Sequence, residues 1–294
     1  MSTVRPAQRG LLFLGCLLAF VRWEPAPYDL FLIIIFLLYA RGLTWKSYQL
    51  VFVVLLGPLL FTHVPALGAA LEVAPERTLY YSLVTLYLAL SSVFFMSLPE
   101  RSVPLLLLGY EVGALLSGLL GVLAFLRIPG LEDLLWGGSR AVAFFKDPNV
   151  FGAFLIPALF LALARLEQGR KFWILPALIL FLGVLVSLSR GAWANFAVAL
   201  LAWWLLRPRK RIWLPLVLLT LAGGVGISVV VMPDNPIVQR LGFMPYDKER
   251  FFTQMEALSL ALTQPLGYGP GLSEIHLSYA THNTYVRFLA EVGW

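Results

Sequence analysis

The sequence has 294 residues, of which 60% are hydrophobic and 13% are charged, and its mean hydropathy is +0.82. A soluble domain carries roughly 25% charged residues, and it exposes too much surface to hide such an excess of apolar side chains. The composition therefore excludes a soluble enzyme, a disulfide-stapled secreted domain and a disordered chain, and it indicates an integral membrane protein.

Long apolar runs predict the secondary structure. A membrane-spanning helix needs about 20 mostly apolar residues, with roughly 17 as the lower limit. In chain order the runs cover residues 10–22, 28–40, 49–67, 79–97, 103–126, 148–164, 172–188, 191–206, 212–231 and a start at 283. We predict an all-α polytopic membrane protein with about ten transmembrane helices in a single membrane domain over residues 1–294. Because the run that starts at 283 is too short to span, we expect the protein to continue after Trp294.

The distribution of basic residues predicts the orientation of these segments. With the N-terminus in the cytoplasm, the inner face holds 12 of the 22 lysines and arginines but only two of the 16 acidic residues. Such an excess in short loops follows the positive-inside rule. The basic cluster at 207–211 then belongs to this inner anchor, and no nucleic-acid partner is expected. The same orientation places two longer polar stretches, 127–147 and 232–282, on the outer face.

The first candidate site is the short polar link Ser187-Leu-Ser189-Arg190-Gly191 between two apolar runs. We predict a tight helical hairpin in which Gly191 permits the reversal and Arg190 is held at the membrane boundary. A guanidinium in this position can bind a phosphate through two parallel hydrogen bonds. It can equally extend to lipid headgroups, and the residues alone leave both interpretations open.

The second candidate lies at the start of the run 148–164. Asp147 followed by Pro148 has the pattern of an N-cap residue and a first helical residue, and this structural role is the favoured interpretation. The positive end of the helix would point to the same side as Arg190. An anionic headgroup could use that end, which makes Asp147 a candidate supporting residue.

The outer stretch 232–282 is predicted to contain an amphipathic helix from Lys248 to Gln264 that lies along the membrane surface. Its apolar residues recur with helical spacing on one face. They are Phe251, Met255, Leu258 and Leu262. Arg250 lies near the start of this helix, and Pro265 follows its end.

Histidine is rare, and only His63, His276 and His282 occur. His282 lies where the outer stretch re-enters the membrane and is followed by Asn283. An imidazole there can act as a general base or stabilise a leaving phosphate, although a helix-capping or headgroup-facing role would also account for it. With a single cysteine, Cys16, and no His-Glu-x-x-His pair, the sequence predicts no metal site and no cofactor.

Glu111 lies in the middle of the predicted span 103–126. A charged carboxylate is costly at membrane depth, so we expect Glu111 to be protonated or paired with a neighbouring helix.

Taken in chain order, these motifs resemble the O-antigen ligase and O-antigen polymerase superfamily of polytopic bacterial membrane glycosyltransferases. The resemblance covers roughly residues 140–294, and the N-terminal helices agree with the family only in hydropathy. The matching pieces are Asp147-Pro-Asn149, Ser189-Arg190-Gly191-Ala-Trp193, Arg250 ahead of Ala257-Leu258, Pro265-Leu-Gly267-Tyr-Gly269, and His282-Asn283 followed by Leu289-Ala-Glu291-Val-Gly293. Each motif alone is a weak signal, but their order and spacing match those of the family, so the ordered set is fairly specific for it.

The resemblance implies a metal-independent, inverting transfer of a glycan from undecaprenyl diphosphate to a lipid core or a growing polysaccharide. The reaction would take place at the outer, periplasmic face of the bacterial cytoplasmic membrane. By the same resemblance, Arg190 and Arg250 would bind the donor diphosphate, and His282 would be the catalytic residue. Asp147 and Asn283 would support them.

Two other classes of function compete with glycan transfer. A transporter or flippase of lipid-linked glycans would have ionisable groups and broken helices near the bilayer midplane. Glu111 is the candidate of this kind, whereas most polar residues gather at the outer edge, which favours surface chemistry. A purely structural membrane protein would leave Arg190 and His282 unexplained.

Overall fold

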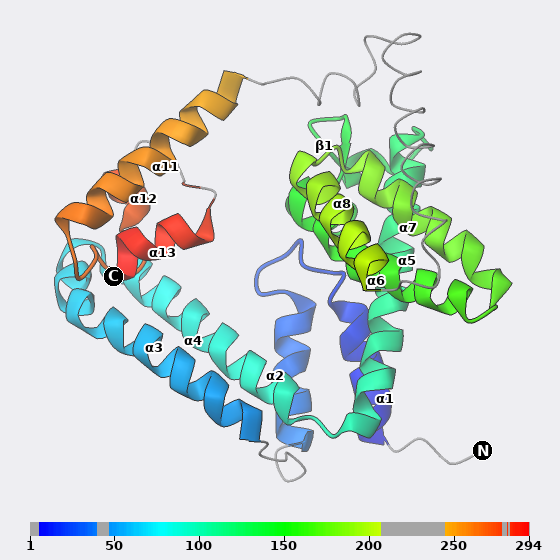
Figure 1. Ribbon diagram of the computed structural model, residues 1–294, viewed down its shortest axis with the longest axis horizontal. Helices are drawn as coiled ribbons and strands as arrows, with labels where there is room; N and C mark the ends of the chain where they lie inside the picture. Colours follow the sequence, from blue (N-terminus) through cyan, green and yellow to red (C-terminus); the bar gives the residue numbers. More distant parts are fainter. Residues whose placement is uncertain (1–5, 40–46, 207–244, 278–280, 282, 294) are drawn as a thin grey trace. The chain divides into compact units, whose positions relative to one another are not determined.

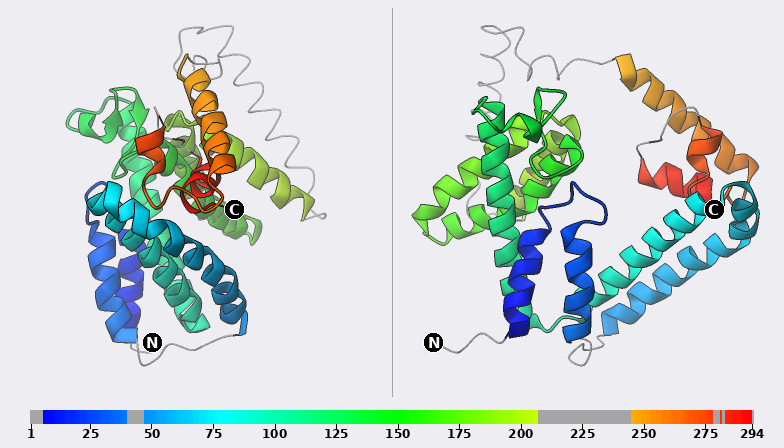
Figure 2. Two further views of the ribbon diagram at one scale, coloured as in Figure 1. Left: turned by 90° about the vertical axis from the view of Figure 1, so that its left-hand side faces the viewer. Right: turned by 180° about the vertical axis from the view of Figure 1, so that it is seen from behind.

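The computed structural model describes residues 6–39, 47–206, 245–277, 281 and 283–293. It consists of two compact units (Figures 1 and 2). Unit 1 comprises Met1–Arg41 and Glu100–Gly242, and unit 2 comprises Gly42–Pro99 and Phe243–Trp294. The basic cluster 207–211, the predicted span 212–231 and His282 lie outside the described residues.

Unit 1 is built from apolar helices and one very short hairpin. Its helices are α1 (Pro6–Leu17), α2 (Pro27–Tyr39), α5 (Val103–Phe125), α6 (Pro148–Glu167), α7 (Ile174–Val186) and α8 (Arg190–Leu205), with single 3-10 turns at η2 (Glu100–Ser102), η3 (Glu132–Leu134) and η4 (Lys171–Trp173). Strands β1 (Leu135–Trp136) and β2 (Arg140–Ala141) pair antiparallel, with Trp136 opposite Arg140. The hairpin lies in the polar stretch 127–147.

Small residues let α1 and α5 approach each other closely, as Figure 1 shows. A Cβ atom added to Gly109 would lie 1.9 Å from the carbonyl oxygen of Leu12, and one added to Gly113 would lie 2.6 Å from that of Cys16. The spacing Gly109-x-x-x-Gly113 places both glycines on one face of α5. Apolar surface alone does not drive helices together in lipid, so this close van der Waals contact is what holds the pair.

The core of unit 1 lies between α5, α6, α7 and α8. Its largest buried side chains include Phe145, Phe151, Leu155, Leu180 and Val184. Glu111 of α5 is also buried, and its carboxylate forms an ion pair of 2.6 Å with the Arg165 guanidinium of α6. The expectation that Glu111 is paired with a neighbouring helix is therefore confirmed.

Unit 2 combines a long helical hairpin with three shorter helices. They are α3 (Ser47–Val73), α4 (Pro75–Ser97), α11 (Pro245–Thr263), α12 (Ser273–His276) and α13 (Thr284–Val292). The buried Gln49 amide of α3 donates hydrogen bonds to the Ser97 hydroxyl and to the Val93 carbonyl of α4. Helix α11 packs on α13 through a small apolar cluster in which Ala257, Leu277 and Ala290 are buried.

Three stretches of the described residues are long and apolar enough to cross a membrane: Pro75–Ser97, Glu100–Phe125 and Pro148–Glu167. They agree with three of the predicted runs and confirm the all-α membrane class, whereas the count of ten spans stays a prediction. The first predicted run, 10–22, differs, since α1 already ends at Leu17. The chain leaves the helix there because its next segment packs on the loop before α6, where the Val21 amide donates to the Phe144 carbonyl at 3.1 Å.

Candidate functional site

The start of α6 is capped as the sequence predicts. The Asp147 side chain accepts a hydrogen bond of 2.6 Å from the Asn149 amide, and Pro148 occupies the first turn. Proline fits this position because the first amide groups of a helix have no partner within the helix. Asp147 therefore has a complete structural explanation.

The tip of the α7–α8 hairpin holds Arg190, as predicted. Helix α7 ends at Val186 and α8 begins at Arg190, so three residues make the whole reversal. The prediction that Gly191 permits this reversal is wrong. Leu188 adopts the left-handed conformation instead, with φ of 48°, and Gly191 lies within the first turn of α8. The turn is stabilised because the Ser189 hydroxyl accepts from the Ala192 amide at 3.1 Å and so caps α8.

Gly152 brings the first turns of α6 against this hairpin tip. A Cβ atom at Gly152 would lie 2.6 Å from the Ser187 hydroxyl oxygen and 2.7 Å from the Ala192 Cβ atom. Side chains cannot accept contacts this short, so only glycine allows the two elements to meet. The starts of α6 and α8 are therefore neighbours in unit 1.

Arg140, which the sequence analysis did not single out, joins these elements. Its Nε atom donates to the Ser187 carbonyl at 3.2 Å, and its Nη2 atom donates to the Asn149 side-chain oxygen at 3.1 Å. The arginine comes from strand β2, 47 residues before Ser187. An arginine in an exposed polar loop carries no local signal for such a long-range contact, although its place in the stretch 127–147 agrees with the predicted outer edge.

We call residues 140, 147–149 and 187–190 the unit 1 rim. It brings together two helix N-termini, the Arg140 side chain that bridges them, and Arg190 as the first residue of α8. The helix dipole favours negative charge at each N-terminus, where the Asp147 carboxylate caps α6 and the Ser189 hydroxyl caps α8. Two guanidinium groups add formal positive charge and a planar arrangement of donors. The unit 1 rim therefore gathers two arginines at the neighbouring starts of two helices.

In unit 2, the predicted amphipathic helix exists as α11, which runs from Pro245 to Thr263 and contains the half-buried Arg250. The predicted apolar stripe faces away from the packed side of the helix. Its four residues are exposed by 62%, 66%, 37% and 65%, in the order Phe251, Met255, Leu258 and Leu262. The packed side is formed by small residues instead, with Ala257 and Ala261 buried.

The start of α13 is ordered around the predicted supporting residue Asn283. Its side-chain oxygen accepts hydrogen bonds from the amides of Tyr285 (3.1 Å) and Val286 (3.3 Å) and so caps the helix. Thr281 is buried, and its backbone carbonyl accepts a hydrogen bond of 3.4 Å from the side-chain amide of Gln254 in α11. The predicted catalytic His282 lies outside the described residues, between these two positions.

A polar network holds the rest of α13 in unit 2. The buried Glu291 carboxylate accepts hydrogen bonds from the Ser273 hydroxyl (2.6 Å) and from Arg287 (2.9 Å). The Arg287 guanidinium also lies 4.2 Å from the centre of the Tyr81 ring of α4. Glu291 stands out in the sequence only as part of a motif, and its buried partners have no local signal.

Arg250 and the α13 start belong to unit 2, whereas Arg190 and Asp147 belong to unit 1. Within the described ranges no group of three or more His, Cys, Asp or Glu side chains has an arrangement that could hold a metal ion.

The comparison with family models gives one match, which covers α7, α8 and the described helices of unit 2 that follow them. Residues 175–294 match the O-antigen ligase family. The resemblance stated from the sequence motifs is thereby confirmed for this part of the chain. The matched region contains Arg190, Arg250, His282 and Asn283, whereas Asp147 and Arg140 precede it. The match supports glycan transfer of the O-antigen ligase type by a membrane protein.

The comparisons with curated proteins and with solved structures gave no significant match.

Proposed function

We propose that the protein transfers a glycan from an undecaprenyl-diphosphate-linked donor to a glycan or lipid acceptor at the outer face of the bacterial inner membrane. The observation that supports this most strongly is the unit 1 rim, where Arg140 and Arg190 lie at two adjoining helix N-termini. The family match to residues 175–294 begins in α7 and includes the Arg190 side of the rim. Together they combine phosphate-binding chemistry with an O-antigen ligase domain.

The chemistry of such a donor explains why a site of this kind is sufficient. The sugar–diphosphate bond is already activated, so the protein needs to stabilise the negative charge that develops on the leaving diphosphate. Preorganised guanidinium and amide donors do this effectively at a site with little water. The second requirement is to hold the acceptor hydroxyl in line with the anomeric carbon.

The proposed roles follow the motif resemblance residue by residue. Arg190 and Arg250 bind the diphosphate, and His282 takes the proton of the acceptor hydroxyl as its oxygen attacks the anomeric carbon. The bond between that carbon and the diphosphate oxygen breaks on the opposite side, so the configuration inverts. Asn283 supports His282 by capping α13 directly after it. No metal ion takes part in this proposal.

A transfer assay tests the proposal. The full chain in lipid nanodiscs is incubated with an undecaprenyl-diphosphate-linked glycan and candidate acceptors in the presence of EDTA. We expect product from the natural chain and a loss of about 100-fold for Arg190→Lys, because lysine keeps the charge but loses the paired donors. Arg170→Lys, at an exposed position after α6, is the matched control and should transfer normally.

Two results would contradict the proposal. Full transfer by Arg190→Lys would remove the diphosphate role of Arg190, and a strict need for a divalent metal would remove the metal-independent mechanism. The orientation is tested separately by replacing Cys16 with serine and placing one cysteine at the exposed Glu256 of α11. An impermeant reagent should label that cysteine from the periplasmic side.

The transporter alternative gains no support from Glu111. Its carboxylate is buried against Arg165, and the Arg165 guanidinium lies 4.1 Å from the centre of the Trp173 ring. A paired and stacked arrangement of this kind locks α5, α6 and η4 together, which is a structural role.

A further inference from the structure

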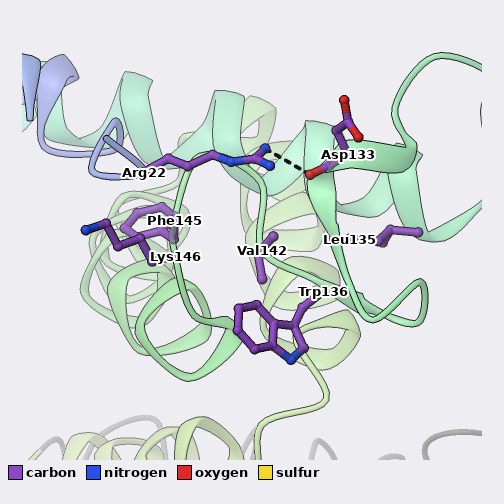
Figure 3. Close-up of a pocket in the computed structure, with 7 residues that line it drawn as sticks. All are labelled: Arg22, Asp133, Leu135, Trp136, Val142, Phe145 and Lys146. Carbon is purple, nitrogen blue, oxygen red and sulfur yellow. Dashed lines mark hydrogen bonds between the residues drawn. The ribbon is translucent and has the colours of Figure 1, made fainter. Parts of the chain in front are cut away.

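Unit 1 contains a pocket of about 350 Å³ (Figure 3). The residues that line it are Arg22, Asp133, Leu135, Trp136, Val142 and Phe145, together with Lys146. They come from the segment after α1, from η3 and the β-hairpin, and from the approach to α6. This volume lies at the lower end of the roughly 300–1,000 Å³ that ligand pockets occupy, so the pocket suits a small ligand or a short part of a larger one.

Two residues of the pocket lining adjoin residues of the unit 1 rim. Trp136 is paired with Arg140 across the β-hairpin, and residues directly opposite each other project from the same face of a two-stranded sheet. Lys146 immediately precedes Asp147, the cap of α6. A ligand held at the rim by its phosphates would therefore have its neighbouring groups beside Trp136.

The charged residues that line the pocket carry both signs, with Arg22 and Lys146 against Asp133. The Arg22 guanidinium donates to the Asp133 carbonyl at 2.9 Å, and Lys146 forms an ion pair with Glu24. Glu132 precedes Asp133 on η3, and backbone hydrogen bonds lower the pKa of its carboxyl. Because Lys146 is paired with Glu24 and Asp133 adds a negative charge, the pocket is not a strongly positive site for a multiply charged anion. It offers donors and acceptors to a neutral ligand with many hydroxyl groups.

The exposed ring in the pocket points to the same ligand class. Trp136 remains 54% exposed although it lines a pocket, so its indole face is available for contact. Indole is a large and rigid apolar surface with one polar edge. Sugar rings present C–H groups on one face and hydroxyl groups at the edge, which matches an aromatic floor surrounded by mixed charges.

We propose that this pocket is a glycan-binding subsite that receives the sugar residues next to the diphosphate of the donor. The inference rests on the proposed function for the identity of the donor, whereas the ligand class follows from the pocket itself. It assigns binding roles to Trp136, Arg22 and Asp133, none of which lies in the region that matches the family model.

The test uses the full chain in lipid nanodiscs and an array of neutral oligosaccharides of two to four sugars, free of phosphate. We expect the natural chain to bind members of the array, and Trp136→Ala to weaken that binding about five- to tenfold, the effect of losing one aromatic contact. Trp136→Phe keeps a ring and should restore most of the binding. Trp23→Ala is the matched control, since Trp23 is 56% exposed in the same unit but does not line the pocket.

Three outcomes would overturn the subsite. The first is that the natural chain binds no neutral oligosaccharide. The second is that Trp136→Ala binds the oligosaccharides as well as the natural chain does, which would make the indole a lipid-facing anchor. The third is that inorganic pyrophosphate competes for the pocket and loses affinity in Trp136→Ala, which would make it an anion site.

Kinetics separate this proposal from the proposed function. In the transfer assay, Trp136→Ala should raise KM for the lipid-linked donor with little change in kcat, because the lost contact is made before and during the reaction alike. Transfer without any dependence on Trp136 would remove the subsite and leave the proposed function intact. If the chain shows no transfer activity but binds oligosaccharides in a way that depends on Trp136, the proposed function is removed and the subsite remains.

Discussion

Unit 1 and unit 2 hold their helices in place in different ways. In unit 1, the starts of α6 and α8 are held by shape, because Gly152 leaves room for Ser187 and Ala192. In unit 2, α13 is held by charge, because the Glu291 carboxylate binds Ser273 and Arg287. A steric fit tolerates no added atom, whereas a hydrogen-bonded network tolerates any side chain that keeps the donors and acceptors. Substitutions should therefore separate the two units by the kind of change that they tolerate.

The largest expected effect is that of His282→Ala, which concerns the chemistry of unit 2. General acid–base groups contribute roughly 10²–10⁴-fold to rate, so transfer should fall by that factor while the protein stays in the membrane. His276→Ala is the control, because His276 is exposed on α12 and packs against Tyr268. Equal activity of the two variants would mean that His282 is not the catalytic residue.

Gly152→Ala should break the steric fit of unit 1. The added methyl group must displace the Ser187 hydroxyl and Ala192, and overpacking of this kind costs about 1–3 kcal/mol. The melting temperature of the protein in nanodiscs should fall by several degrees. Gly191→Ala is a matched control, since the nearest atom to its added Cβ is the Ser189 hydroxyl at 3.8 Å.

Because alanine has the higher helix propensity, Gly191→Ala should leave the melting temperature unchanged or slightly higher. A large loss of stability in Gly191→Ala would instead show that Gly191 permits the reversal, as the sequence suggested. The structure assigns that conformation to Leu188.

Glu291→Gln should weaken the electrostatic fit of unit 2 by a smaller amount. The amide keeps the shape and one hydrogen bond but loses the charge that faces Arg287, a difference of about 1 kcal/mol. Glu256→Gln on the exposed side of α11 serves as the control. If both variants melt at the same temperature as the natural chain, the network around Glu291 adds nothing to the stability of α13.

The comparison also shows what the sequence could predict. Local patterns were sufficient for the Asp147 cap, the hairpin at Arg190 and the helix near 248–264, because each depends on residues a few positions apart. The stripe on α11 predicted the helix and is exposed, whereas the packed face of Ala257 and Ala261 had not been predicted.

Other features depend on contacts between distant parts of the chain. Arg140 reaches Ser187 across 47 residues, and Trp136 enters a pocket with Arg22, which comes from the segment after α1. The spacing of residues within one segment cannot predict contacts between segments so far apart in the sequence. Leu188 was missed for another reason, since glycine is the usual residue for a left-handed turn and Gly191 stands nearby.

The smallest expected effect is that of Asp147→Asn, and it decides what Asp147 does. Asparagine caps a helix as well as aspartate, so the unfolding free energy should change by less than about 0.5 kcal/mol, whereas Asp147→Ala should cost about 1 kcal/mol. If Asp147 only accepts the Asn149 amide, as its hydrogen bond of 2.6 Å indicates, the asparagine variant will also transfer glycan normally. A stable Asp147→Asn protein with impaired transfer would instead show that the charge itself acts at the unit 1 rim. Thermal melting and the transfer assay, performed on the same samples, distinguish the two roles because only the second depends on the negative charge.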